Sequence, residues 1–232
     1  MISHRPWDAL DKADLPWLRA RYHFQVRPDA PQGHLPLGPL IVWNDDEIAP
    51  GGGFPLHGHR DVEILTYVRQ GTLGHRDTLG SEGTLHAGDV QVMSAGTGIR
   101  HTEFNQGDVP LSLYQIWFLP RETGGLPAWD RRTFPLADRS GRFAVLASGY
   151  AQDKDAMPIR ADARLLCATL KAGERVQQPL RAPQQAYLVV ASGHIEVEGE
   201  LMGPRDGAVI TQLAAIDILA LDDTELVMVE TG

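Results

Sequence analysis

The stretch GGGFPLHGHRDVEILTYVRQG, residues 51–71, and the later stretch HAGDVQVMSAGTGIRHTEFN, residues 86–105, decide the fold of this chain. Both consist of short segments rich in Val, Ile, Leu and Thr that are separated by glycine, which is typical of antiparallel strands joined by tight turns. Gly51, Gly52 and Gly53 leave the backbone unrestrained by a Cβ just where a strand would enter the mouth of a barrel. The two stretches therefore predict an all-β fold.

Each stretch also carries a pair of metal-binding side chains, His57-Gly-His59 in the first and His101-Thr-Glu103 in the second. Residues i and i+2 of a β-strand point to the same face, so each pair can direct two donor atoms toward one point. Three imidazoles and one carboxylate, without a thiolate, suit a first-row divalent ion better than a closed structural zinc site. Four ligands leave one or two positions open on such an ion, and we expect a reactive centre.

The same pattern continues along the chain, whose 24 glycines and 16 prolines are spread evenly. Helical periodicity is scarce, and residues 8–18 are the best candidate for a short helical turn. The segments expected to form strands are 38–43, 62–69, 71–77, 83–86, 89–94, 100–104, 112–119, 142–147, 163–170, 186–190, 194–197, 208–211 and 225–229. Many short strands with few helices predict sandwiches or barrels.

A change in composition divides the chain. The run RETGGLPAWDRRTF, residues 121–134, has Gly, Pro and charge in place of alternation, as expected of a connection between two domains. We therefore expect an N-terminal metal-binding domain at residues 1–134 and a C-terminal domain at residues 135–232. Together they would form two antiparallel β-sandwich or jelly-roll barrels in tandem, with few short helices.

The two halves repeat each other faintly. Leu65–Gly71 aligns with Tyr187–Gly193, an apolar strand that ends in a glycine turn, and residues 87–90 align more loosely with residues 206–209. At the offset of the first alignment, His57 and His59 fall on Pro179 and Arg181, which cannot bind a cation. A duplicated fold that has lost its site in one copy would explain this pattern.

Composition excludes several classes of function. The formal charge is −9, from 30 acidic and 21 basic residues, and no basic stripe is present that could neutralise phosphates, so we expect no direct nucleic-acid binding. No apolar run is long enough for a signal peptide or a membrane span, which predicts a soluble cytoplasmic protein. Cys167 is the only cysteine, and its apolar neighbours favour a buried, unreactive thiol.

The two quoted stretches resemble the two cupin motifs as they are written in the pirin family of the cupin superfamily, and most closely the bacterial pirin-like proteins described as quercetin 2,3-dioxygenases. The likeness extends upstream through LGPLIVWNDDEIAPG, residues 37–51. It implies a bicupin whose second domain lacks metal ligands, in agreement with the internal repeat.

The resemblance also implies the roles of individual residues. The positions that hold the metal in pirins, usually Fe(II), match His57, His59, His101 and Glu103, and Mn, Ni, Co, Zn and Cu are alternatives. The general cupin pattern would favour Glu63 as a ligand. Because Glu63 lies about 20 Å along an extended strand from His57, we instead expect it behind the ligands, hydrogen-bonded to one of them.

The expected reaction is the opening of the central ring of a flavonol such as quercetin by dioxygen, with loss of carbon monoxide. Glu103 could serve as both ligand and catalytic base. An apolar slot for a flat aromatic substrate would be lined by Phe54, Met93, Phe104 and Trp117. The remaining histidines are assigned to surface or structural roles: His4, His23, His34, His75, His86 and His194.

Two alternatives remain open at the sequence level. In the first, the protein is a metal-dependent regulatory pirin that binds a protein partner and turns over no substrate. In the second, it is a cupin enzyme with another substrate, since one ligand set supports several reactions on this architecture.

Overall fold

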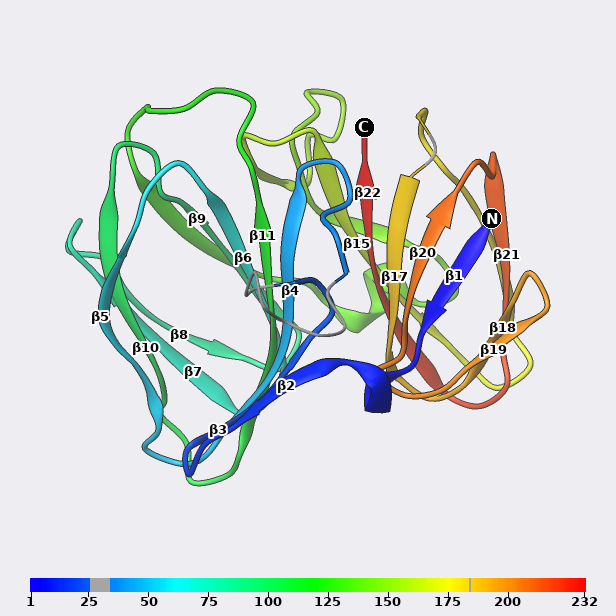
Figure 1. Ribbon diagram of the computed structural model, residues 1–232, viewed down its shortest axis with the longest axis horizontal. Helices are drawn as coiled ribbons and strands as arrows, with labels where there is room; N and C mark the ends of the chain where they lie inside the picture. Colours follow the sequence, from blue (N-terminus) through cyan, green and yellow to red (C-terminus); the bar gives the residue numbers. More distant parts are fainter. Residues whose placement is uncertain (26–33, 184) are drawn as a thin grey trace.

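The computed structural model describes residues 1–25, 34–183 and 185–232. It shows two β-barrels side by side, the first to the left in Figure 1 and the second to the right. Helix is confined, in the part of the chain that is described, to two 3₁₀ turns, η1 (Trp7–Ala9) and η2 (Leu136–Arg139). The prediction of an all-β bicupin is confirmed.

Alternating apolar and polar residues build the strands of the first barrel, and glycines with positive φ, such as Gly71 and Gly88, close several of its turns. Its strands are β2 (Asp11–Asp14), β3 (Leu18–Tyr22), β4 (Leu40–Ile48), β5 (Gly53–His59), β6 (Glu63–Gln70), β7 (Thr72–Asp77), β8 (Glu82–His86), β9 (Asp89–Ser94), β10 (Ile99–Asn105), β11 (Leu111–Phe118) and β12 (Ala128–Thr133).

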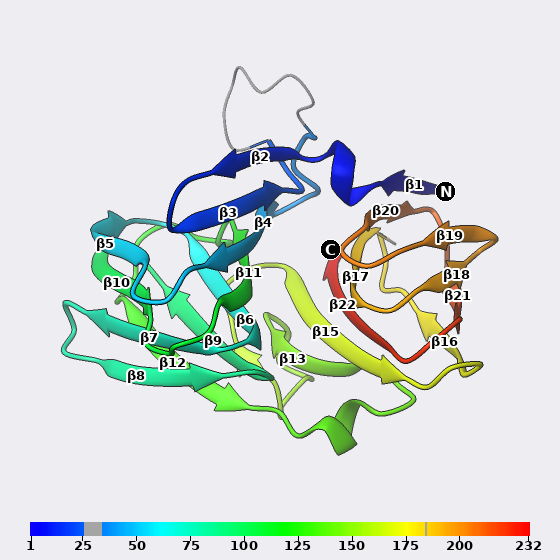
Figure 2. The ribbon, with the colours of Figure 1, turned by 90° about the horizontal axis from the view of Figure 1, so that it is seen from below.

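The second barrel contains β13 (Ala144–Ser148), β14 (Met157–Pro158), β15 (Ala163–Leu170), β16 (Arg175–Pro179), β17 (Gln185–Ser192), β18 (Ile195–Val197), β19 (Glu200–Met202), β20 (Gly207–Thr211), β21 (Ala215–Ala220) and β22 (Thr224–Thr231). It also takes up the first strand of the chain, β1 (Ile2–Arg5), which pairs antiparallel with β20 at the edge of its large sheet, as Figure 2 shows. Residues 2–5 thus lie in the second barrel, although the sequence placed them in the first.

Each barrel is made of a seven-stranded and a four-stranded sheet with matching strand orders. The large sheets run β12-β9-β6-β11-β4-β3-β2 and β1-β20-β17-β22-β15-β13-β14, and the small sheets run β5-β10-β7-β8 and β16-β21-β18-β19. The strands named in the internal repeat, β6 with β17 and β9 with β20, occupy equivalent positions. The repeat in the sequence is therefore a repeat of the fold.

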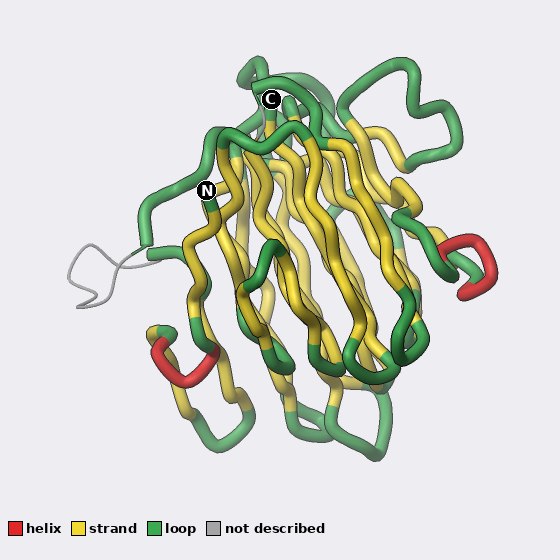
Figure 3. Tube along the Cα trace, turned by 90° about the vertical axis from the view of Figure 1, so that its right-hand side faces the viewer, coloured by secondary structure: helices red, strands yellow, loops and turns green. Residues whose placement is uncertain are grey.

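The two large sheets face each other and bury the largest apolar cluster between the barrels. Trp43 of the first barrel packs against Tyr187 of the second with ring centroids 5.5 Å apart, and the ring of His23 lies 2.8 Å from the Tyr187 hydroxyl. Cys167 belongs to this cluster and is fully buried, and burial raises the pKa of its thiol to about 12. Figure 3 shows the strands of these layers running in nearly the same direction.

One expected connection is partly a strand. Within residues 121–134, which the sequence suggested as an irregular link, Ala128–Thr133 forms β12 and pairs along its whole length with β9. It is an edge strand with charged, exposed residues, and such strands lack the apolar alternation that identifies buried ones. Within the described residues, no helix is long and apolar enough to cross a membrane.

Candidate metal centre

The two histidine-bearing strands lie next to each other in the small sheet of the first barrel. β5 and β10 pair antiparallel with His57 directly opposite His101 and Ile99 opposite His59. A bulge between His101 and Glu103 shifts the register, so Glu103 lies opposite Phe54. The alternation read from the sequence therefore places all four side chains on the inner face of this sheet.

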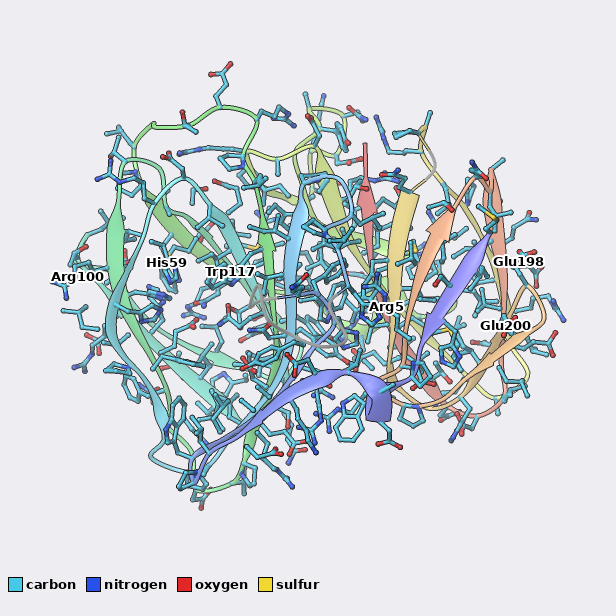
Figure 4. All side chains as sticks on the ribbon, viewed as in Figure 1. Arg5, His59, Arg100, Trp117, Glu198 and Glu200 are labelled. Atoms are coloured by element: carbon cyan, nitrogen blue, oxygen red, sulfur yellow. The ribbon has the colours of Figure 1, made fainter. Side chains whose placement is uncertain are left out.

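Three imidazoles converge inside the barrel. The donor nitrogens of His57, His59 and His101 all lie within 4.8 Å of one another, and the Nε2 atoms of His57 and His101 are 3.1 Å apart. In Figure 4, His59 points from β5 into the barrel toward Trp117, with their ring centroids 4.9 Å apart, whereas Arg100 points outward. This is the spacing expected of ligands that share one ion.

Glu103 belongs to a second, overlapping group. Its carboxylate lies with His101 and His75 so that their donor atoms are within 4.8 Å of one another. His101 is common to both groups and joins the three-histidine cluster to the carboxylate. The four predicted ligands thus lie side by side without forming one group at this distance.

A row of polar side chains across the large sheet holds the Glu103 carboxylate. Pairing aligns Gln91 of β9 with Thr66 of β6, Thr66 with Gln115 of β11, and Gln115 with Asn44 of β4. The amides of Gln91 and Gln115 donate to the two carboxylate oxygens, the latter at 2.6 Å, and the Thr66 hydroxyl lies 3.4 Å from Oε1. These donors orient Glu103 toward the histidines.

Burial keeps His59 and His101 neutral. Together with the neighbouring histidines, it lowers the pKa of His59 to about 4 and that of His101 to about 2. His57 Nδ1 lies 2.8 Å from the carbonyl oxygen of Pro55, which can only accept, so this nitrogen carries the proton and Nε2 keeps its lone pair. Neutral imidazoles with free lone pairs are the form that binds metal ions.

Burial has the opposite consequence for the carboxylate. It raises the pKa of Glu103 to about 7, against the hydrogen bonds from Gln91, Gln115 and Thr66, which lower it. A carboxyl group with a pKa near neutrality can take up or release a proton at physiological pH.

The residues fit a divalent ion. Nε2 of His59 is buried and has no hydrogen-bond partner anywhere in the described part of the chain. Buried nitrogens of this kind are costly without a partner, and a cation beside the three lone pairs would provide one. Nitrogen and oxygen donors without sulfur match Fe(II), Mn, Ni or Co.

A cavity of about 240 Å³ opens beside the histidines. Of the four residues expected to line an aromatic slot, Phe54 and Trp117 do so. Met93 is instead buried in an apolar cluster with Ile64, and Phe104 lies on the outer face of β10 because it alternates with Glu103. The full lining is Asn44, Asp46, Phe54, His57, His59, Ile64, His101, Glu103, Gln115 and Trp117.

Glu63 lies away from this cavity. β5 ends at His59, and Asp61 adopts a positive φ of 51°, so the alternation does not continue to Glu63. Its carboxylate accepts hydrogen bonds from the Ser94 hydroxyl at 2.7 Å and from the backbone N–H of Arg160 at 3.0 Å, which ties the first barrel to the second. The expectation of a place behind the ligands is not met.

His75 is the residue that the sequence interpretation missed. Its ring stacks on Trp129 at 4.6 Å, and its Nε2 lies 3.1 Å from Asp77, as a structural histidine would. Its Nδ1, however, is buried without a partner in the described residues, and β7 places it opposite Glu103 on β10. The pair His75-x-Asp77 has the same i, i+2 spacing as the two recognised pairs and could have been found by the same rule.

Comparison with known proteins gives matches over both barrels. Residues 6–118 match the family model described as Pirin, and residues 145–231 match the model described as Quercetinase C-terminal cupin domain. The chain is 51% identical to a pirin-like protein of Caulobacter vibrioides, with 100% of both chains covered. It is 34% identical to a quercetin 2,3-dioxygenase of Escherichia coli K12, over 98% of this chain and 97% of that one.

A solved structure extends the likeness to the fold. The bacterial pirin YhhW from Escherichia coli, in complex with nickel(II), superimposes with a TM-score of 0.92 at 32% sequence identity, over 100% of this chain and 99% of that one. Similarity therefore spans both barrels and the connection between them.

Proposed function

The chain belongs to the pirin family, and on that premise we propose that it is a metal-dependent dioxygenase that opens the central ring of a flavonol such as quercetin. The observation that carries the proposal is a cluster of three imidazoles, joined through His101 to the Glu103 carboxylate, beside a cavity walled by Phe54 and Trp117. Relatives named quercetin 2,3-dioxygenase support the substrate class.

We assign His57, His59, His101 and Glu103 as the residues that would hold the ion, with Fe(II) as the native metal. The nickel(II) complex of a relative indicates that other divalent ions also suit this fold. Bound there, a divalent ion would supply Lewis acidity and open positions for oxygen ligands. Fe(II) is our choice because donors of this type, with open positions, are typical of non-haem iron oxygenases.

The side chains supply positioning and proton transfer. Phe54 and Trp117 form walls against which a flat ring can lie. With its pKa at about 7, Glu103 is suited to take the proton of the flavonol 3-hydroxyl, and Gln91 and Gln115 keep its carboxylate in reach. The cavity is smaller than the usual ~300–1,000 Å³ of sites that enclose a ligand, so we expect only the part of the flavonol near the ion to be enclosed.

Assays of the purified protein test the proposal. Samples loaded with Fe(II), Mn, Ni or Co receive quercetin and oxygen, and loss of flavonol absorbance and release of carbon monoxide are followed. Turnover is expected with Fe(II) and absent from His101→Ala, whereas the control His86→Ala, an exposed histidine on β8, should match the wild type. Absence of turnover with all four metals would contradict the quercetin dioxygenase and favour a regulatory, protein-binding pirin or a cupin enzyme with another substrate.

A further inference from the structure

The run Asn44-Asp45-Asp46-Glu47 on β4 separates into two faces. Asp45 and Glu47 point outward and form ion pairs with arginines: Asp45 binds Arg69 and Arg205, and Glu47 binds Arg205 at 2.6 Å. Strand alternation sends Asn44 and Asp46 the other way, into the barrel. One face of the run thus has charge partners and the other faces the cavity.

The two inward residues have unsatisfied oxygens. Asp46 is 1% exposed, and its Oδ1 is buried without a hydrogen-bond partner among the residues described; the same holds for Oδ1 of Asn44. Both residues line the cavity that contains the histidine cluster. Buried polar atoms are normally satisfied, so two unpartnered oxygens on one cavity wall indicate a missing hydrogen-bond donor.

Asp46 lies in a buried, acidic environment. Burial raises the pKa of Asp46 well above its ordinary value, and the nearby charges of Asp45 and Glu103 raise it further. A carboxyl oxygen that no protein donor reaches is suited to accept a hydrogen bond from a hydroxyl group of a bound molecule. Asn44 stands at the end of the polar row that holds Glu103, which brings its amide close to the ion-binding groups.

We propose that Asn44 and Asp46 form a subsite that binds a substrate hydroxyl group additional to the oxygen pair that meets the ion. This inference rests on the proposed function and deepens it by naming the substrate class. The subsite selects polyhydroxylated flavonols over flavonols that carry the 3-hydroxyl alone. An analogue without the extra hydroxyl leaves the two oxygens unpaired inside the barrel, and that loss is the source of discrimination.

Two probes separate this contribution from metal binding. Quercetin and 3-hydroxyflavone share the 3-hydroxyl and 4-carbonyl, but 3-hydroxyflavone has no other hydroxyl. Their dissociation constants are measured on Fe(II)-loaded protein without oxygen, so that no turnover interferes. The wild type should bind quercetin more tightly, by about tenfold or more, as expected for one buried hydrogen bond that is made or left unmade.

Variants test the residues. Asn44→Ala and Asp46→Ala should lose the preference for quercetin and bind 3-hydroxyflavone as the wild type does, at unchanged metal content. Asp46→Leu is close in size to the native side chain but cannot form hydrogen bonds, and it serves if the alanine variant does not fold. Glu47→Gln, on the outer face of the same strand, is the matched control and should keep the preference.

The outcomes distinguish the two proposals. Equal affinity of the wild type for both probes, or an unchanged preference in the folded variants, would contradict the proposed subsite. Neither result would bear on the proposed dioxygenase function. A preference that Asp46 controls, in a protein that never turns over quercetin, would support the subsite and contradict the dioxygenase.

Discussion

The two barrels share a strand order but differ in what fills them. The polar row of the first barrel is Asn44, Gln115, Thr66 and Gln91, carried by β4, β11, β6 and β9. The equivalent strands β15, β22, β17 and β20 align four apolar residues in the second barrel: Leu166, Met228, Leu188 and Ala208. The same scaffold therefore accommodates either a polar site or an apolar core.

The small sheets differ in the same way. β5 and β10 bring His57 opposite His101, whereas β16 and β21 bring Gln178 opposite Ile216 and Val176 opposite Ile218. Both isoleucines are fully buried in the single apolar cluster of the second barrel. The interior of the first barrel holds two smaller clusters. A polar centre takes the place of apolar burial in the first barrel, and the largest apolar cluster lies between the two barrels.

The largest expected effect is the loss of the ion from the first barrel. His101→Ala should weaken metal binding by more than about 100-fold, since losing even an outer partner of a ligand costs about 10–100-fold. The fold should persist, because the apolar clusters do not include His101. Elemental analysis and circular dichroism of the purified variant measure both.

Glu103→Ala should behave in the same way, whereas Arg181→Ala, at the position of the second barrel that aligns with His59, should leave the metal content of the protein unchanged. A folded His101→Ala or Glu103→Ala protein with full metal occupancy would show that the ligand assignment is wrong.

A second experiment makes the apolar barrel polar. Met228→Gln places an amide in a fully buried row without partners and should lower the free energy of unfolding by about 2–4 kcal/mol. Urea unfolding, with metal content as a second readout, measures the effect. An unchanged midpoint would mean that the second barrel tolerates polar groups as the first one does.

The reverse exchange makes the polar row apolar. Gln115→Met conserves volume but removes the hydrogen bond to Glu103, so metal affinity should fall by about 10–100-fold. Because the substitution leaves a buried oxygen of Glu103 without this donor, the apoprotein should lose about 1–3 kcal/mol of stability. Competition with a chelator measures the affinity, and an affinity equal to that of the wild type would remove Gln115 from the support of the site.

The smallest effect is a change in protonation. Because the pKa of Glu103 is about 7 in the apoprotein, metal binding should release about 0.9 proton from it at pH 6 and about 0.1 at pH 8. His59 and His101, with pKa values of about 4 and 2, should release none in this range. Calorimetry in buffers of different ionisation enthalpy counts the protons, and Glu103→Gln should abolish this pH-dependent release.

The raised pKa of Glu103 also makes the stability of the apoprotein depend on pH. The folded state holds the Glu103 proton more tightly than the unfolded chain, so this contribution is complete below the ordinary pKa of 4.5 and is lost as pH rises through about 7. Added metal should therefore raise the melting temperature more at pH 8 than at pH 6. A larger rise at pH 6 would contradict the direction assigned to Glu103.

Local rules explain why much was predictable. The i, i+2 spacing of His57 and His59 and the glycine turns are properties of single strands, and they survive folding unchanged. The weak repeat between the halves corresponds to equivalent strands in the two large sheets. The metal ligand set itself stays a prediction until an ion is measured.

The structure differs from the sequence interpretation at three residues of the predicted site. The expectation for Glu63 extends the alternation of β5 across Asp61, where a positive φ ends it. Met93 and Phe104 are close to the ligands in sequence, but Met93 packs in an apolar cluster and Phe104 lies on the outer face of β10, so neither lines the cavity. The polar row was invisible, because its members come from separate strands that no periodicity connects.

The β-architecture, the duplication, the family resemblance and the inward pairs of candidate ligands follow from the sequence, since these depend on alternation and turns within short segments. The register between strands follows only from the folded sheets. That register brings His75 beside Glu103, aligns Asn44 with Gln115, and leaves the oxygens of Asn44 and Asp46 unpartnered beside the cavity. The reason is physical: pairing between strands far apart in sequence is fixed by the packing of the whole sheet, and a one-residue slip would turn each side chain to the other face.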